Sequence, residues 1–455
     1  MEYIDARKIL EEIEKKYDVM KIKYKGVPVW LFLRCYLIAH MYSDRPSNTK
    51  SINKLNVKAV IGNLFCYPVI NLFKKNRIWI YDGVITRKKV GEKYYHHVTG
   101  AITELVHDSL LLESPERVKK HYRMTEIPEK RIISNAWSIL IARGLIPFIG
   151  RIKIENGDLL EEIISEYKIK FDYNYYIKFF LAQRKTVDFL LRIAPNPKVV
   201  FMVNAYNQMG YVWSFHNHNI PVVEMQHGVI NKGHFAYNSF FHNDVLHPDE
   251  ICVYGEVEFN YFTIEQKNYC NKVTMTGLYL LDCSDKEFNT DIFSEYRKQY
   301  QKIVVLAGQT GYEELLMDFT EKLAIRQPSY LFIYIPRRHV DSSLLRQSNI
   351  IYKEGVNIYE YLKWCDIHST ISSTTCLEAH YFKKPIVFYV TKNSVAMDYY
   401  GGILGNENGA FYVNTTEDFI KVAEKLGNTA YSYRELFAHH SVENMKKVIC
   451  RYLKE

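Results

Sequence analysis

The feature that most constrains this chain is the alternation of short apolar runs with helical segments between residues 196 and 430. Four such runs, each stopped by a turn residue, occupy residues 198–204, 220–228, 250–255 and 272–277, and four more occupy 303–308, 329–336, 366–371 and 385–390. Strands that alternate with helices through short turns form a parallel sheet covered by helices on both faces. The pattern therefore predicts an α/β protein with two doubly wound, Rossmann-like parallel sheets, joined near residue 282.

The regions on either side of this pattern complete the predicted domain organisation. Residues 1–75 have the apolar periodicity of helices, and we expect them to form a helical preface. The first sheet domain then spans 76–282, the second spans 283–430, and a helix closes the chain within 431–455. Ligands of open α/β sheets bind outside the carboxyl ends of the strands, so we expect function in the loops that follow the strands, in a cleft between the two sheets.

The charge of the chain is concentrated in the helical preface. The formal net charge is +8, and the first 80 residues, with 15 basic and 7 acidic side chains, account for all of it. Such a local excess favours an anionic surface such as lipid headgroups, and we expect no nucleic-acid partner. The apolar stretch 59–73, flanked by Lys54, Lys58, Lys74 and Lys75, is short for a membrane span and fits either an interfacial segment or a buried helix.

The cysteine and histidine residues indicate neither a metal site nor a disulfide framework. The eight cysteines include no C-x-x-C pair, which is typical of reduced thiols in a cytoplasmic protein. Six histidines crowd residues 216–247, but His216 and His218 point apart on the predicted helix and no carboxylate pair completes a ligand set. We therefore expect a cytoplasmic protein without a metal, in peripheral contact with the inner face of the plasma membrane at most.

A run of hydroxyl side chains marks an anion site in the second sheet domain. Ser372, Ser373, Thr374 and Thr375 follow a strand and open a helix, where free backbone N–H groups and the helix dipole favour a phosphate. The alternative is an ordinary helix cap, which needs one hydroxyl. One turn further on, Glu378 is placed to accept the hydroxyls of a ribose, or else is a surface residue.

Two further loops of this domain also suit a nucleotide diphosphate. Arg337, Arg338 and His339 follow the strand 329–336, and guanidinium groups match phosphate oxygens geometrically. The loop at Gly308 and Gln309 is made of small and polar residues that let a ligand approach the backbone. Neither loop contains a G-x-G-x-x-G or Walker pattern, so nicotinamide and ATP chemistry lack support.

The first sheet domain offers a candidate base. His227 stands directly before a turn glycine at the end of the strand 220–228, and an unperturbed imidazole has a pKa suited to proton abstraction near neutral pH. Glu224 on the same strand is a candidate for orienting it. The alternative is a histidine of the core. We assign the acceptor pocket to Glu224, Gln226 and the residues that follow the turn, Asn231, Lys232 and His234.

Taken together, these motifs resemble those of bacterial two-domain (GT-B) glycosyltransferases of capsule and surface polysaccharide synthesis. The resemblance rests on Gln226-His227-Gly228, the Ser372-Ser373 helix start, Glu378-Ala379 and Lys384-Pro385, and it covers residues 196–415. Sialyl-, Kdo- and glycerophosphate-transferring relatives are similar, and so, more distantly, are nucleotide-sugar 2-epimerases. By this resemblance, Ser372, Ser373 and Thr374 bind the donor phosphates, Glu378 the ribose, and His339 with Arg337 or Arg338 the leaving phosphate. Gln309 of the loop at Gly308 is a further donor-binding candidate. The base is His227 or Glu313.

The resemblance implies a function and leaves two alternatives. We expect a metal-independent, inverting glycosyltransferase that moves a sugar from a nucleotide-sugar onto a growing capsule or lipopolysaccharide glycan, with the nucleotide-sugar as substrate and no cofactor. The alternatives are a nucleotide-sugar 2-epimerase, which needs no acceptor, and a non-catalytic scaffold of a polysaccharide assembly complex. Turnover of the donor without a glycan distinguishes the first, and the absence of nucleotide binding distinguishes the second.

Overall fold

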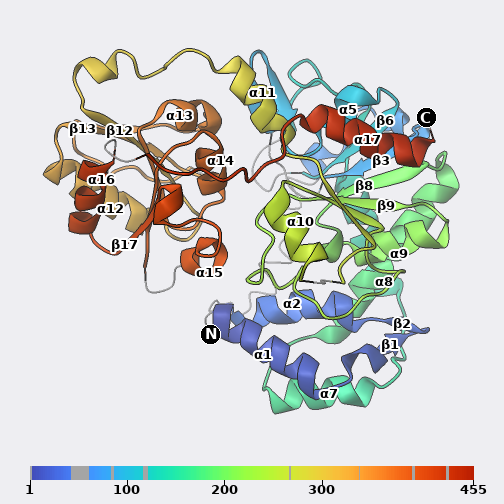
Figure 1. The fold of residues 1–455 in the computed structure, drawn as a ribbon. Helices are drawn as coiled ribbons and strands as arrows, with labels where there is room; N and C mark the ends of the chain where they lie inside the picture. Colours follow the sequence, from blue (N-terminus) through green and yellow to red (C-terminus); the bar gives the residue numbers. More distant parts are fainter. Residues whose placement is uncertain are drawn as a thin grey trace.

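Two parallel β-sheets form the framework of the protein, as its computed structural model shows (Figure 1). The structure describes residues 3–42, 61–82, 87–115, 121–265, 268–337, 339–391, 395–426 and 430–454. The first lobe contains a seven-stranded sheet of order β11-β10-β9-β8-β3-β6-β7. Its strands are β3 (Ile78–Tyr81), β6 (Ser109–Glu113), β7 (Ile132–Ser134), β8 (Val199–Val203), β9 (Val222–Met225), β10 (Glu250–Val253) and β11 (Lys272–Met275).

The second lobe contains a six-stranded parallel sheet of order β14-β13-β12-β15-β16-β17. Its strands are β12 (Lys302–Ala307), β13 (Tyr330–Ile335), β14 (Ile350–Tyr352), β15 (Ile367–Thr370), β16 (Ile386–Tyr389) and β17 (Ala410–Val413). The predicted fold class, two doubly wound parallel sheets with a helical amino-terminal part, is confirmed. The strand order reverses between β3 and β8 in the first sheet and between β12 and β15 in the second, and ligands of open α/β sheets bind at such points.

Helices cover both sheets. The α-helices are α1 (Tyr3–Lys16), α2 (Trp30–Tyr42), α5 (Gly100–Leu105), α6 (Ala136–Leu145), α7 (Gly157–Glu166), α8 (Tyr173–Ile193), α9 (Met209–Asn217), α10 (Glu256–Thr263), α11 (Tyr279–Glu287), α12 (Glu313–Arg326), α13 (Ile358–Trp364), α14 (Thr375–Tyr381), α15 (Ala396–Tyr400), α16 (Thr416–Lys425) and α17 (Ser441–Leu453). The 3₁₀ helices of the described ranges are η1 (Val19–Lys21), η2 (Val69–Phe73), η3 (Ile146–Phe148), η4 (Ala205–Asn207), η5 (Tyr296–Lys298) and η6 (Asn406–Asn408). Two hairpins, β1–β2 (Lys23–Tyr24, Val27–Pro28) and β4–β5 (Arg87–Val90, Lys93–His96), stand outside the sheets.

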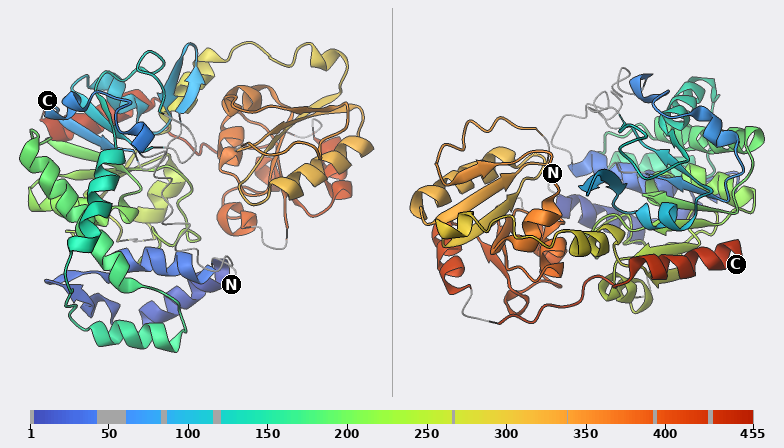
Figure 2. Two further views of the ribbon diagram at one scale, coloured as in Figure 1. Left: turned by 180° about the vertical axis from the view of Figure 1, so that it is seen from behind. Right: turned by 90° about the horizontal axis from the view of Figure 1, so that it is seen from above.

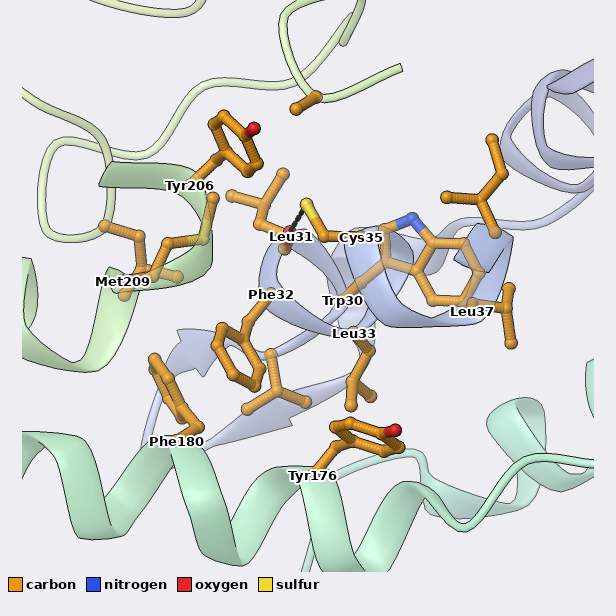
Figure 3. Close-up of a cluster of buried hydrophobic side chains, with 14 of the residues drawn as sticks. Trp30, Leu31, Phe32, Leu33, Cys35, Leu37, Tyr176, Phe180, Tyr206 and Met209 are labelled. Atoms are coloured by element: carbon orange, nitrogen blue, oxygen red, sulfur yellow. Dashed lines mark hydrogen bonds between the residues drawn. The ribbon is translucent and has the colours of Figure 1, made fainter. Parts of the chain in front are cut away.

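The amino-terminal helices are part of the core of the first lobe. Helix α2 is apolar almost all round, and Phe32 packs on Phe180 of α8 with ring centroids 4.9 Å apart (Figure 3). Arg34 of α2 donates to the buried carboxylate of Glu14 of α1 at 2.6 Å, which ties the two helices together. Tyr206 lies at the edge of the same core, so the amino-terminal helices support the loop that follows β8.

The carboxyl-terminal helix returns to the first lobe after the chain has completed the second (Figures 1 and 2). The backbone N–H of Ser441 donates to the carboxylate of Asp282 at 2.7 Å, and the Tyr452 hydroxyl donates to Glu250 at 2.8 Å. The predicted segment 431–455 therefore ends in a helix, α17, that packs on the first lobe. Chain crossings at α11 and again at residues 430–440 connect the two lobes.

Two further properties of the fold concern the length of its helices and its cysteine thiols. Within the described ranges, no helix combines the length and the apolar character that a bilayer crossing requires. All eight cysteines are free thiols, as the sequence predicts.

Candidate functional site

The loop that follows β9 places His227 at the carboxyl edge of the first sheet. The Gln226 side chain fixes this loop, because its Oε1 accepts from the Tyr254 N–H at 2.7 Å and its Nε2 donates to the Gly228 carbonyl at 2.7 Å. Gln226 also donates to Glu258 at 3.1 Å and is 1% exposed. Its amide is thus used within the protein, and it acts by positioning the turn rather than as the predicted acceptor ligand.

His227 and His234 lie on the same side of this loop, beside Tyr206. The ring centroid of Tyr206 is 6.3 Å from that of His227 and 5.7 Å from that of His234. Burial lowers the pKa of His227 to about 4, and burial together with the nearby His227 lowers the pKa of His234 to about 3. Both imidazoles are therefore neutral at pH 7. The Nδ1 atoms of both are buried without a hydrogen-bond partner among the described residues.

The hairpin β4–β5 of the first lobe places a lysine side chain against the second lobe. Arg87 anchors the hairpin, since its guanidinium pairs with the buried carboxylates of Glu113 and Glu129. The next residue, Lys88, places its Nζ 3.6 Å from the centre of the Tyr359 ring of the second lobe, a cation–π contact. The Asn357 amide donates to the Lys89 carbonyl at 2.9 Å, which holds the hairpin against α13.

Glu378 of α14 contacts the same Tyr359 side chain and is influenced by the charge of Lys88. The carboxylate is 7% exposed; its Oε1 accepts from the Tyr359 hydroxyl at 3.4 Å, and its Oε2 is buried without a partner in the described structure. Burial raises the pKa of Glu378 to about 7, an effect that Lys88 opposes, and burial lowers the pKa of Lys88 to about 8. The charges of these two groups, one from each lobe, thus influence each other.

His97 is a further buried group near Lys88 and the histidines. Burial holds its pKa well below the usual value, and the charges of Lys88, His96 and His227 lower it further. The charges of Lys88 and His227 thus both act on His97, and the charge of Lys88 also acts on Glu378 of the second lobe. We call the five residues Lys88, His97, His227, His234 and Glu378 the interlobe site.

The predicted phosphate loop differs from expectation in how its backbone is used. Gln309 contacts this loop, because its Oε1 accepts from both the N–H and the hydroxyl of Ser372 at 2.9 Å. However, the N–H of Ser373 donates to the Thr370 hydroxyl, and the N–H of Thr375 donates to the Ser373 hydroxyl. Local side chains thus cap the backbone groups that we expected to be free. The donor role of Ser372, Ser373 and Thr374 stays a prediction.

Other predicted donor residues lie apart from the interlobe site. His339 is largely exposed, and its Nδ1 is 2.8 Å from a carboxylate oxygen of Glu354, which follows the edge strand β14. Glu313 accepts from the Gly311 N–H at 2.6 Å and so stabilises the start of α12. Arg337 is exposed, whereas Arg338 falls outside the described residues. The catalytic roles predicted for His339 and Glu313 stay predictions.

Glu224 belongs to the core behind the site. It is fully buried, and its carboxylate accepts from the hydroxyls of Tyr237 and Tyr269 and from the Ala205 N–H. The expectation that Glu224 contacts an acceptor or orients His227 is not supported at this position. The loop over residues 229–247 covers the strand end and supplies Tyr237, which is why the carboxylate faces protein rather than ligand.

The remaining predicted acceptor residues connect the lobes or face solvent. Asn231 donates its amide to the Tyr399 carbonyl of the second lobe at 2.5 Å. Close by, Arg7 of α1 forms an ion pair of 2.9 Å with Asp398 of α15. Lys232 is exposed and lies 3.6 Å from Glu265. This second set of interlobe contacts lies at the amino-terminal side of the molecule, where α1 approaches α15 (Figure 1).

The sequence did not indicate that Lys88, His97 and the aromatic residues around them belong to the site. Two short segments, Arg87–Val90 and Lys93–His96, are separated by Gly91, which has a positive φ of 58°. A glycine of this kind between two short strands is a hairpin signal. The signal predicts the hairpin but not its contact with a domain that begins some 200 residues later, because that contact depends on how the two lobes pack.

Glu258, which accepts a hydrogen bond from Gln226, makes the free energy of unfolding depend on pH. Burial raises its pKa from 4.5 to about 7, and its Oε2 has no partner among the described residues. The native state therefore binds more protons than the unfolded state between these values, and the free energy of unfolding falls as the pH rises from about 4.5 to 7. We expect Glu258→Gln to reduce this slope by up to about 1.4 kcal/mol per pH unit in urea titrations. The exposed control Glu295→Gln leaves the slope unchanged, and an unchanged slope in Glu258→Gln contradicts the expectation.

Two cavities of the described structure lie outside the interlobe site. One of about 440 Å³ is lined by residues of α5 and α11, including Tyr279, together with Tyr95 and Glu129, and another of about 440 Å³ lies between α14 and residues 433–439. Neither is lined by a residue of the interlobe site. Among the described residues, no group of three or more His, Cys, Asp or Glu side chains is arranged to hold a metal ion.

Comparison with known proteins finds similarity at the level of chain path only. No family model matches the chain, and no curated protein matches it. The calicheamicin glycosyltransferase CalG4 aligns over 84% of this chain and 99% of its own, with 10% identity and a TM-score of 0.49. The UDP-GlcNAc 2-epimerase of Methanocaldococcus jannaschii, in complex with UDP-GlcNAc and UDP, aligns over 82% and 99%, with 12% identity and a TM-score of 0.45. The S. aureus MnaA–UDP structure aligns over 65% and 87%, with 14% identity and a TM-score of 0.44.

Proposed function

We propose that the protein is a nucleotide-sugar-dependent glycosyltransferase whose reaction takes place at the interlobe site. The observation that carries the proposal is that Lys88 of the first lobe lies 3.6 Å from the centre of the Tyr359 ring of the second, whose hydroxyl donates to the buried Glu378. The sequence assigned Glu378 to a donor ribose and His227 to an acceptor hydroxyl. A site that uses both lobes suits a reaction that brings two substrates together.

The polar atoms left without partners support a ligand at this position. Glu378 Oε2, His227 Nδ1 and His234 Nδ1 are all buried and unpartnered among the described residues. Buried polar atoms are normally hydrogen-bonded, so a cluster of exceptions favours a ligand that supplies the missing partners. A ribose has two adjacent hydroxyls that can donate to Glu378. An acceptor hydroxyl can donate to the neutral imidazole of His227.

The transfer step follows from these positions. The acceptor oxygen forms a bond to the anomeric carbon of the sugar while its proton passes to His227 Nδ1. The bond between the anomeric carbon and the phosphate oxygen breaks, and its electron pair stays on the phosphate. Lys88 supplies positive charge for that leaving group, with Arg337 and Arg338 as the further cations expected from the sequence. One displacement of this kind inverts the anomeric configuration and needs no cofactor.

The acceptor in the proposal is a growing capsule or lipopolysaccharide glycan at the cytoplasmic face of the membrane. This part rests on the resemblance of the motifs to polysaccharide-synthesising enzymes. The neutral histidines His227 and His234 and the exposed Lys232 provide hydrogen-bonding groups typical of a polyhydroxyl ligand site.

Product analysis with a panel of donors tests the proposal. The protein is incubated with UDP-, CMP-, GDP- and CDP-sugars, with and without glycan fragments, and the products are followed by NMR and mass spectrometry. We expect release of the nucleotide and growth of the glycan only when both substrates are present. Conversion of the donor sugar to its 2-epimer without a glycan identifies an epimerase instead. Absence of both turnover and thermal stabilisation by every nucleotide supports the scaffold.

A further inference from the structure

The segment 61–73 exposes four large apolar side chains while it buries two asparagines together with Leu64, Tyr67 and Leu72. Ile61, Phe65, Ile70 and Phe73 are 47–75% exposed, whereas Asn63 and Asn71 are almost fully buried. Asn63 accepts from the His121 N–H at 2.8 Å, and Asn71 donates to the Ile132 carbonyl at 3.2 Å. Hydrogen bonds thus fix the segment with the four apolar side chains toward the outside. An exposed patch of large apolar side chains is an unusual feature of a protein surface.

Helix α6 extends the same surface. The Trp137 indole N–H donates to the Leu64 carbonyl at 2.9 Å, and the rings of Trp137 and Phe65 are in edge contact at 5.3 Å. From Trp137, spacings of four, three and four residues lead to Ile141, Gly144 and Phe148, and Phe148 is 84% exposed. We call Ile61, Phe65, Ile70, Phe73, Trp137 and Phe148 the apolar face. Exposed contiguous apolar surfaces of this kind mark interaction sites.

The two segments that carry the apolar face have basic but no acidic side chains, although Arg77 at the end of the first segment pairs with Asp108 at 2.7 Å. Residues 61–77 and 136–153 contain six lysine or arginine side chains and no aspartate or glutamate. Lys74 and Lys75 directly follow the exposed Phe73 and are themselves exposed. Interfaces between proteins are depleted in lysine, whereas exposed aromatic residues bordered by lysines are typical of surfaces that bind anionic lipid.

We propose that the apolar face docks the protein onto a bilayer that contains anionic phospholipid. In this arrangement Phe65 and Phe148 enter the boundary between headgroups and acyl chains, while Lys74 and Lys75 contact the headgroup phosphates. The face begins beside the carboxyl end of β7, because α6 follows that strand directly. From there the face extends to Phe73, Lys74 and Lys75, which precede β3 and so lie toward the amino ends of the parallel strands. Nucleotide binding does not enter the argument, so the proposal stands independently of the proposed function.

Vesicle flotation tests the docking surface. The full chain is mixed with vesicles of phosphatidylcholine alone or with 30% phosphatidylglycerol, in the presence of about 0.1 M and about 0.5 M salt. We expect binding to the anionic vesicles, weakened at the higher salt. Lys74→Ala/Lys75→Ala should lower the partition coefficient about 30-fold, since each lysine near an anionic surface contributes about 1 kcal/mol. Phe65→Ser/Phe148→Ser should lower it at least about tenfold, through the lost apolar burial.

Matched variants separate docking from general effects of charge and apolarity. Lys446→Ala/Lys447→Ala removes two exposed lysines from α17, and Ile264→Ser/Ile325→Ser removes two exposed apolar side chains elsewhere. Both controls should bind vesicles like the parent. Equal binding by all variants, equal binding to neutral vesicles, or no binding at all overturns the proposal. Light scattering tests whether the parent protein is a dimer. If it is, and if Phe65→Ser/Phe148→Ser is a monomer, the apolar face binds a second copy of the chain instead of a membrane.

Discussion

Replacement of His227 by alanine is expected to lower the rate of sugar transfer by about 10²- to 10⁴-fold, the usual contribution of a general base. Burial keeps the imidazole neutral at pH 7, and its Nδ1 has no partner among the described residues, so this atom can accept a hydrogen bond from the acceptor hydroxyl. Single-turnover transfer with saturating donor measures the effect on the chemical step. Donor affinity should change little, because the ribose and phosphates are assigned to other residues.

His218→Ala is the matched control for this substitution. His218 follows α9 on the surface, 3.4 Å from the carboxylate of Asp188, and its loss should leave the rate within about twofold. Glu313→Gln tests the alternative base. A full rate in His227→Ala together with a large loss in Glu313→Gln contradicts the role of His227 and moves the base to the second lobe.

Replacement of Glu378 by glutamine is expected to weaken nucleotide binding by about 10- to 100-fold, because hydrogen bonds to a charged acceptor contribute about 1.5–3 kcal/mol. The same residue makes binding depend on pH. Glu378 is ionised above its pKa of about 7, and Lys88 is protonated below its pKa of about 8. Affinity should therefore rise as the pH approaches 7, reach its maximum between about 7 and 8, and fall above 8. Isothermal titration calorimetry from pH 6 to 9 measures the profile.

Glu378 and Lys88 should control opposite sides of this pH profile of nucleotide affinity. Glu378→Gln should abolish the rise on the acid side, and Lys88→Met should abolish the fall on the alkaline side. Glu435→Gln, at an exposed carboxylate of the same lobe, should reproduce the parent profile. A parent affinity that does not vary with pH, or equal binding by parent and Glu378→Gln, is incompatible with a ribose contact at Glu378.

The order of strands and helices between residues 196 and 390 was predictable because most of these strands are short apolar runs with a turn residue after them. Helices α1 and α2 lie within the segment 1–75 that was predicted to be helical. The short strands β7, β14 and β17 were missed, since each has only three or four residues. Pairing with a neighbouring strand, rather than local pattern, makes them strands.

The candidate site was only partly predictable. A position at the end of a strand indicated His227 and Glu378, and both belong to the interlobe site. Lys88 comes from a hairpin outside both sheets, and its role arises from packing against Tyr359 of the other lobe. Glu224 shows the opposite case, because the loop folded over β9 satisfies its carboxylate with two tyrosine hydroxyls. Strand patterns locate an edge of a sheet but do not say which side chains remain available there.

Hydrogen–deuterium exchange in the presence of a nucleotide tests most directly whether ligand binds between the lobes. If the nucleotide binds between the lobes, exchange should become slower in peptides from both, namely 87–97 and 226–237 of the first lobe and 372–381 of the second. Protection confined to one lobe, or to residues 100–107 and 279–287 around the cavity beside α5, would contradict a nucleotide site built from Lys88, His227 and Glu378.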